Sequence, residues 1–108
     1  MYKNGFARSQ MARSMSRETF LKYVATTIER QLQEWNASYA VVVLKLTDYH
    51  VWVNGTEEYY ELSVAVDELE QLQKSSPYAL DRHIWRLLQN QGLSIEKGYG
   101  DYIEFVMQ

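Results

Sequence analysis

The stretch YAVVVLKLTDYHVWVNGTEEYYELSV, residues 39–64, decides the fold because strand patterns follow one another along its whole length. Residues 39–47 are almost all β-branched, aliphatic or aromatic, which is typical of a central strand. Further along, the Asn54-Gly55 pair predicts a type I′ hairpin turn, since both residue types tolerate the positive φ angles of that turn. We therefore expect consecutive strands in antiparallel order.

The first strand has two unequal faces. One face is apolar without interruption: Ala40, Val42, Leu44 and Leu46. The other mixes apolar and polar side chains: Tyr39, Val41, Val43, Lys45 and Thr47. Because successive side chains of a strand point to opposite faces, we expect helices to cover the first set and to leave the second as a semi-apolar surface.

The register of the following hairpin, with strands over 49–53 and 57–65, decides which aromatic side chains are buried. With a two-residue turn, His50 and Trp52 share a face with Glu57, Tyr59 and Glu61. With a three-residue loop ending at Thr56, they share it with Glu58, Tyr60, Leu62 and Val64. We prefer the second register because it gives the aliphatic residues of the last strand a buried side.

Helix signals flank this region on both sides. Ser16 is a candidate N-cap for a helix over 17–35, whose apolar side chains recur every three or four residues. Two further helices are expected over 67–75 and 77–91, the second ending at Gly92 as a C-terminal cap. The alternating residues of 102–108 predict a closing strand.

The predicted fold class is therefore α+β, with the element order α-β-β-β-α-α-β. We expect a single domain over residues 16–108, built as a largely antiparallel four-stranded sheet with helices packed on one face. Residues 1–15 contain basic side chains and no acid, and they are expected to form a flexible basic leader.

Composition sets further limits. A chain of 108 residues is long enough for one core. It has no cysteine, which fits a reducing compartment, and it has no apolar run approaching the roughly 20 residues of a membrane span. We expect a cytoplasmic protein that does not enter a membrane.

The net charge of −3 is unevenly distributed. Residues 1–17 hold four of the eleven basic side chains and no acid, so residues 18–108 carry seven bases and all fourteen acids, a formal charge of −7. Since an acidic body repels a phosphate backbone, nucleic-acid binding is expected only if the basic tail carries it.

The sequence contains no recognisable catalytic motif. The two histidines, His50 and His83, have no carboxylate at a known metal-ligand spacing, and the glycines of residues 97–102 form no phosphate loop. We expect no metal, no cofactor and no catalytic residue.

Two classes of function fit these features. The first is a non-enzymatic interaction or regulatory module that binds another protein or its own copy, because nine tyrosines and three tryptophans exceed what a small core easily buries. The partner-binding candidates are Tyr49, His50, Trp52 and Tyr59.

The second class is a small-anion binding protein or enzyme. Its pocket would lie between the sheet and the helix over 77–91, with Arg82 and Arg86 holding the anion and His50 or His83 donating a proton. The same two arginines, spaced four residues apart, also fit an ordinary solvated helix face.

Overall fold

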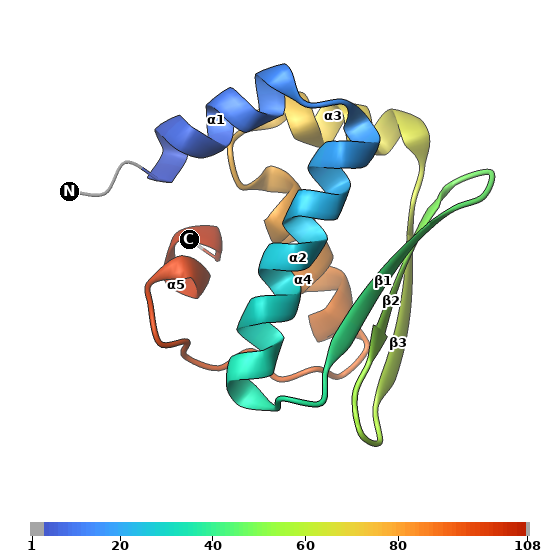
Figure 1. Cartoon of the computed structure of the whole chain (residues 1–108), viewed down its shortest axis with the longest axis vertical. Coiled ribbons are helices and arrows are strands. Elements are labelled where there is room, and N and C mark those ends of the chain that lie inside the picture. The colour runs from blue at the N-terminus through green and yellow to red at the C-terminus, as the bar shows by residue number, and fades with distance from the viewer. Residues whose placement is uncertain (1–3, 108) are drawn as a thin grey trace.

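The computed structural model describes residues 4–107, with side chains from residue 5 onward. Its elements, in chain order, are α1 (Asn4–Ser14), α2 (Arg17–Trp35), β1 (Ala40–Lys45), β2 (Tyr49–Asn54), β3 (Tyr59–Val64), α3 (Val66–Ser75), α4 (Ala79–Asn90) and α5 (Tyr102–Val106). The described helices lie on one side of the sheet, and together they form a single compact α+β domain (Figure 1).

The sheet has three antiparallel strands in the order β1-β2-β3. Val51 of β2 lies opposite Val43 on β1 and Leu62 on β3. Since cross-strand partners share a face, this row points toward the helices and packs into the core. The next row along, Val42, Trp52 and Glu61, points the other way.

The helices that cover the inner face follow the sequence predictions closely. The helix predicted over 17–35 is α2, and the Thr19 amide N–H donates to the Ser16 hydroxyl oxygen at 3.2 Å, which confirms the N-cap. The helices predicted over 67–75 and 77–91 are α3 and α4. Gly92 ends α4 with a φ of 108°, and the following Leu93 amide donates to the Leu88 carbonyl at 3.0 Å.

The prediction for the first strand is wrong in two respects. β1 is an edge strand, and its inward side chains are Val41 and Val43, whereas Ala40, Val42 and Leu44 lie on the uncovered face. Because residues 40–44 are all apolar, both faces of this strand are apolar, and the sequence pattern does not indicate which face points to the core. The buried side of the neighbouring β2 settles it, because paired residues must share a face.

The hairpin between β2 and β3 also differs from the prediction. Asn54 pairs with Tyr59, so the loop spans 55–58, and among the described residues only Gly92 has a positive φ. The type I′ turn and the preferred three-residue loop are therefore wrong. A Cβ at position 55 would lie 2.8 Å from the Glu58 carboxylate and 2.9 Å from the ring of Tyr39, so glycine fits there without a shift of either side chain.

The fourth predicted strand does not form. Residues 102–106 are helix α5, and position 108 lies outside the described residues. Ile103 and Val106 are both buried against the other helices, and their three-residue spacing puts them on one side of a helix, whereas in a strand they would face opposite ways. Within residues 4–107, no further strand is added at either edge of the sheet.

The N-terminal segment is likewise more structured than predicted. Residues 4–14 of the expected leader form α1, while residues 1–3 lie outside the described residues. The physical reason is Arg8, a buried side chain that ion-pairs with Asp81 and so attaches this segment to the domain.

The cap of α4 generates a stability prediction. Gly92→Ala is expected to lower the free energy of unfolding by about 1–2 kcal/mol, because a Cβ strains the left-handed backbone. Among the described residues, and apart from the two chain neighbours of Gly92, no heavy atom lies within 4 Å of that Cβ, so the loss of stability reports the backbone strain.

The matched control is Gly100→Ala, where the Cβ also meets nothing within 4 Å and φ is not positive. Urea denaturation should show a lower free energy of unfolding for Gly92→Ala and an unchanged one for Gly100→Ala. Equal stability of both variants would contradict the assigned cap.

Candidate functional site

No described helix covers the outer face of the sheet, because the described helices lie on its other side (Figure 1). We call it the outer sheet face. Its side chains alternate with those of the core: Ala40, Val42 and Leu44 on β1, His50, Trp52 and Asn54 on β2, and Tyr59, Glu61 and Ser63 on β3.

The β1 side of this face is apolar. Val42 is 40% exposed, and Leu46, just beyond the end of the strand, is 61% exposed. Neither side chain gains from contact with water, so burying them against another surface would be favourable.

Trp52 occupies the middle of the outer sheet face, with Val42 opposite on one side and Glu61 on the other. The ring is half-buried. In the part of the chain that the structure describes, its Nε1 is the buried side-chain polar atom that has no hydrogen-bond partner. Such a donor is costly inside a protein unless an acceptor is supplied.

The β3 side is polar. The Tyr59 hydroxyl donates to the Glu61 carboxylate over 3.4 Å, and Tyr59 is 54% exposed. Local desolvation and the negative charge of Glu61 raise the pKa of Tyr59. The phenol is therefore a neutral donor at physiological pH. The outer sheet face as a whole changes from apolar at β1 to polar at β3.

The structure brings together three of the four predicted partner-binding residues. His50, Trp52 and Tyr59 lie on the outer sheet face. Tyr49 does not: it lies on the inner face and is 4% exposed, with Lys45 over its ring at 5.4 Å. Its assignment to a binding surface is wrong because adjacent residues of a strand point in opposite directions.

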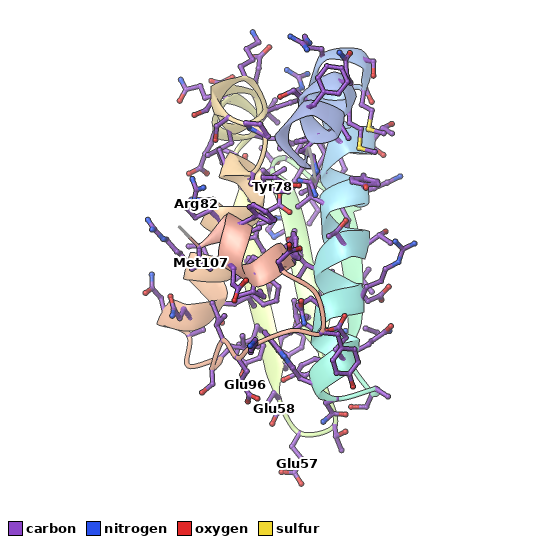
Figure 2. All side chains as sticks on the ribbon, turned by 90° about the vertical axis from the view of Figure 1, so that its left-hand side faces the viewer. Glu57, Glu58, Tyr78, Arg82, Glu96 and Met107 are labelled. Atoms are coloured by element: carbon purple, nitrogen blue, oxygen red, sulfur yellow. The ribbon has the colours of Figure 1, made fainter. Side chains whose placement is uncertain are left out.

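The predicted anion site is not assembled. The side of α4 that faces the sheet is filled by core side chains such as Leu80, Ile84 and Leu88. The Nε–H of Arg82 donates to the Val106 carbonyl at 2.6 Å, and Arg86 is exposed. Figure 2 shows Arg82 beside α5 and near Met107, remote from the cluster of Glu57, Glu58 and Glu96 at the other end of the domain.

The two histidines are also separated. The Nε2 atom of His83 on α4 lies 3.3 Å from the carboxylate of Glu68 on α3. His50 lies on the outer sheet face. Within residues 4–107, no group of three or more His, Cys, Asp or Glu side chains could hold a metal ion. No helix in this range has the length and apolar character needed to span a membrane.

Sequence reasoning missed a buried polar cluster that joins α1, α4 and α5. The Arg8 guanidinium donates to one Asp81 carboxylate oxygen, and the Tyr102 hydroxyl donates to the other at 2.6 Å. Trp85 Nε1 in turn donates to the Tyr102 oxygen at 3.2 Å. The available signal was Asp81 itself, since it precedes Ile84 and Trp85 on the buried side of α4, where an acid needs a partner.

Burial dominates the electrostatics of this cluster. It raises the pKa of the Asp81 carboxyl, while the Arg8 guanidinium and the Tyr102 hydroxyl stabilise the ionised form. Burial and the charge of Asp81 raise the pKa of Tyr102 well above its ordinary value. Tyr102 is thus held as a neutral phenol that donates a hydrogen bond to the carboxylate.

Comparison with known proteins finds no family model, no curated protein and no solved structure that matches the chain.

The opposite placement of two tyrosines is directly testable. Tyr49→Ala empties a core position and is expected to lower the free energy of unfolding by about 3–5 kcal/mol. Tyr59→Ala removes an exposed ring and should leave thermal stability nearly unchanged. Thermal unfolding followed by circular dichroism checks both variants, and comparable losses would contradict the assigned register.

The cluster around Tyr102 predicts a dependence on alkaline pH. The unfolded chain ionises this residue near pH 10, and the folded protein does so only at higher pH. Its contribution to stability is therefore complete below pH 10 and decreases as the pH rises further.

Tyr102→Phe should cost about 1–3 kcal/mol at neutral pH, because Asp81 loses a donor and Trp85 an acceptor. It should also make the decline in stability above pH about 10 shallower than in the unsubstituted protein. Urea titrations at neutral and alkaline pH measure both effects, and parallel pH profiles would show that Tyr102 does not titrate as described.

Proposed function

We propose that the chain is a non-enzymatic protein–protein interaction module, and that its outer sheet face binds the same face of a second copy. The observation that carries the proposal is the position of Trp52, a half-buried ring at the centre of an uncovered, partly apolar sheet face. Large aromatic side chains in such positions commonly carry most of the binding energy of an interface.

The arrangement of the face favours self-association. A two-fold axis that runs across the strands would lay β1 on β1 and β2 on β2 in opposite directions. Val42 lies near the middle of β1, opposite Trp52, so Val42 and Trp52 would each lie close to the same residue of the second copy near the axis. Two sheets packed in this way would bury the Val42 and Trp52 side chains of both copies between them.

The edges of the sheet are less suitable for association than the face. At the β1 edge, the Val41 amide donates to the Glu29 carboxylate of α2 at 2.9 Å. At the β3 edge, the Glu61 carbonyl accepts from the Gln91 side chain at 3.0 Å. Helix side chains thus occupy backbone groups at both edges, which hinders pairing with an added strand.

The other functions weighed from the sequence have less support. The Arg82 guanidinium donates to the Val106 carbonyl of α5, so it does not point into a pocket between the sheet and α4. Arg8 is buried in an ion pair and is not available to a nucleic-acid phosphate from the basic N-terminal segment. The outer sheet face therefore carries the functional proposal.

The proposal predicts the effect of a charge at the centre of the face. Val42→Lys should raise the dimer dissociation constant by on the order of a hundredfold, because two ammonium groups would be desolvated near the axis. Size exclusion coupled to light scattering, over a range of protein concentrations, measures the change in mass.

The control is Phe6→Glu, which changes an apolar side chain on α1 that is 66% exposed and outside the face. It should leave the dissociation constant unchanged. An unsubstituted protein that remains monomeric at high concentration would rule out the second copy as the partner, and equal effects of the two substitutions would rule out the face.

A further inference from the structure

Helix α1 is docked in an unusual orientation. Its aromatic side chain, Phe6, is 66% exposed, whereas Arg8 in the same helix is 5% exposed. A helix that packs for hydrophobic reasons buries its aromatic residue and leaves its charges in water. The docking of α1 therefore depends on the arginine.

The pocket that receives Arg8 is built entirely by other parts of the chain. Phe20 and Tyr23 come from α2 and Tyr78 from the turn before α4, and their ring centres lie 5.9, 5.2 and 4.7 Å from the guanidinium carbon. Asp81 of α4 accepts the guanidinium hydrogen bond. Aromatic faces around a carboxylate form a site suited to an organic cation.

Further hydrogen bonds fix the position of the Asp81 carboxylate in this pocket. The Tyr102 hydroxyl donates a hydrogen bond to the second Asp81 oxygen at 2.6 Å, and the Trp85 Nε1–H donates to the Tyr102 hydroxyl oxygen at 3.2 Å. The carboxylate is therefore oriented by groups that do not belong to α1. A planar guanidinium can stack on rings and donate in a fixed direction, which a lysine ammonium cannot do as well.

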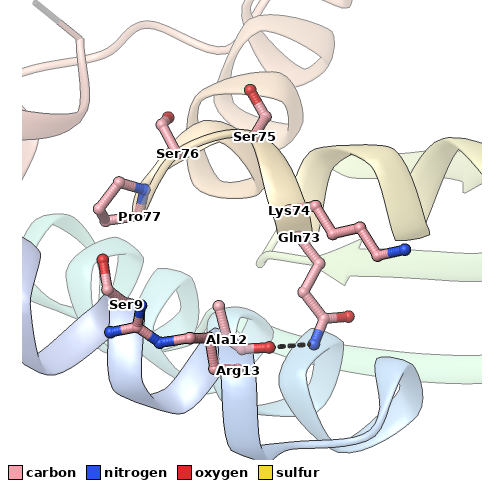
Figure 3. Close-up of a pocket in the computed structure, with 8 residues that line it drawn as sticks. All are labelled: Ser9, Ala12, Arg13, Gln73, Lys74, Ser75, Ser76 and Pro77. Atoms are coloured by element: carbon pink, nitrogen blue, oxygen red, sulfur yellow. Dashed lines mark hydrogen bonds between the residues drawn. The ribbon is translucent and has the colours of Figure 1, made fainter.

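Other contacts also attach α1 to the domain: Met11 and Ala12 are partly buried and pack against the core. The Gln73 side-chain amide donates to the carbonyls of Ala12 and Met15 at 2.7 and 3.0 Å. Beside them, a groove of about 460 Å³ separates α1 from residues 73–77, and Figure 3 shows the lining side chains on its two sides. Outside the arginine pocket, α1 is thus held by partly buried side chains and by Gln73, next to an open groove.

We propose that the pocket formed by Phe20, Tyr23, Tyr78 and Asp81 is an arginine-binding site, and that Arg8 is its internal, exchangeable occupant. An arginine side chain presented by a partner protein binds there in place of Arg8 and releases α1 from the domain. The site is distinct from the outer sheet face, because it is formed on the helical side of the sheet.

The first experiment uses the full chain carrying Arg8→Ala, with ethylguanidinium chloride as the probe. Millimolar ethylguanidinium should raise the melting temperature of this variant, and ethylammonium should raise it less. The unsubstituted protein and an Arg13→Ala control, altered at an exposed arginine of the same helix, should show no comparable rise. Adding Asp81→Asn to the Arg8→Ala chain should abolish the response.

A second arm distinguishes a protein-borne arginine from a small guanidinium compound. A fluorescent peptide of residues 4–15 should bind the Arg8→Ala chain, and replacing Arg8 in the peptide by Ala should weaken binding by on the order of tenfold or more. Replacing Arg13 in the peptide should change the affinity little. A response to ethylguanidinium without peptide binding would overturn the role assigned to a partner protein.

The test remains decisive if Arg8→Ala does not fold alone. Refolding from urea in the presence of ethylguanidinium should then restore the helical circular dichroism signal, and ethylammonium should not. Equal responses to the two cations, or equal responses of the substituted and unsubstituted chains, would overturn the proposal.

Discussion

The pairing of β2 with both of its neighbours is the constraint on which the rest of the structure depends. Val51 is fixed opposite Val43 and Leu62, and this row must be buried because all three side chains are aliphatic. Once it faces the helices, every alternate residue of the sheet is assigned to the other side. The outer sheet face, with Trp52 at its centre, is a geometric consequence of burying β2.

A second constraint acts on the helical side. Asp81 is fully buried, and an unpaired carboxylate there would be strongly destabilising. The fold satisfies it with donors from both ends of the chain, Arg8 from α1 and Tyr102 from α5. A single acid on α4 therefore helps to attach the two terminal helices to the domain.

The two surfaces proposed for binding differ in their physical basis. The outer sheet face offers exposed apolar side chains and the half-buried ring of Trp52, so it suits a partner with a complementary apolar surface. The arginine pocket offers rings and a fixed carboxylate, so it suits one side chain with a defined charge and geometry. Because the outer sheet face and the arginine pocket lie on opposite sides of the sheet, one partner bound at each site would not block the other.

The sequence by itself determined the elements whose signals are local. The helix over 17–35, the caps at Ser16 and Gly92 and the existence of three consecutive strands all depend on nearby residues. Tertiary structure decided the facing of β1, the helical form of residues 102–106 and the burial of Arg8. Each of these depends on a partner far along the chain, and no local pattern specifies which distant strand or carboxylate a residue will meet.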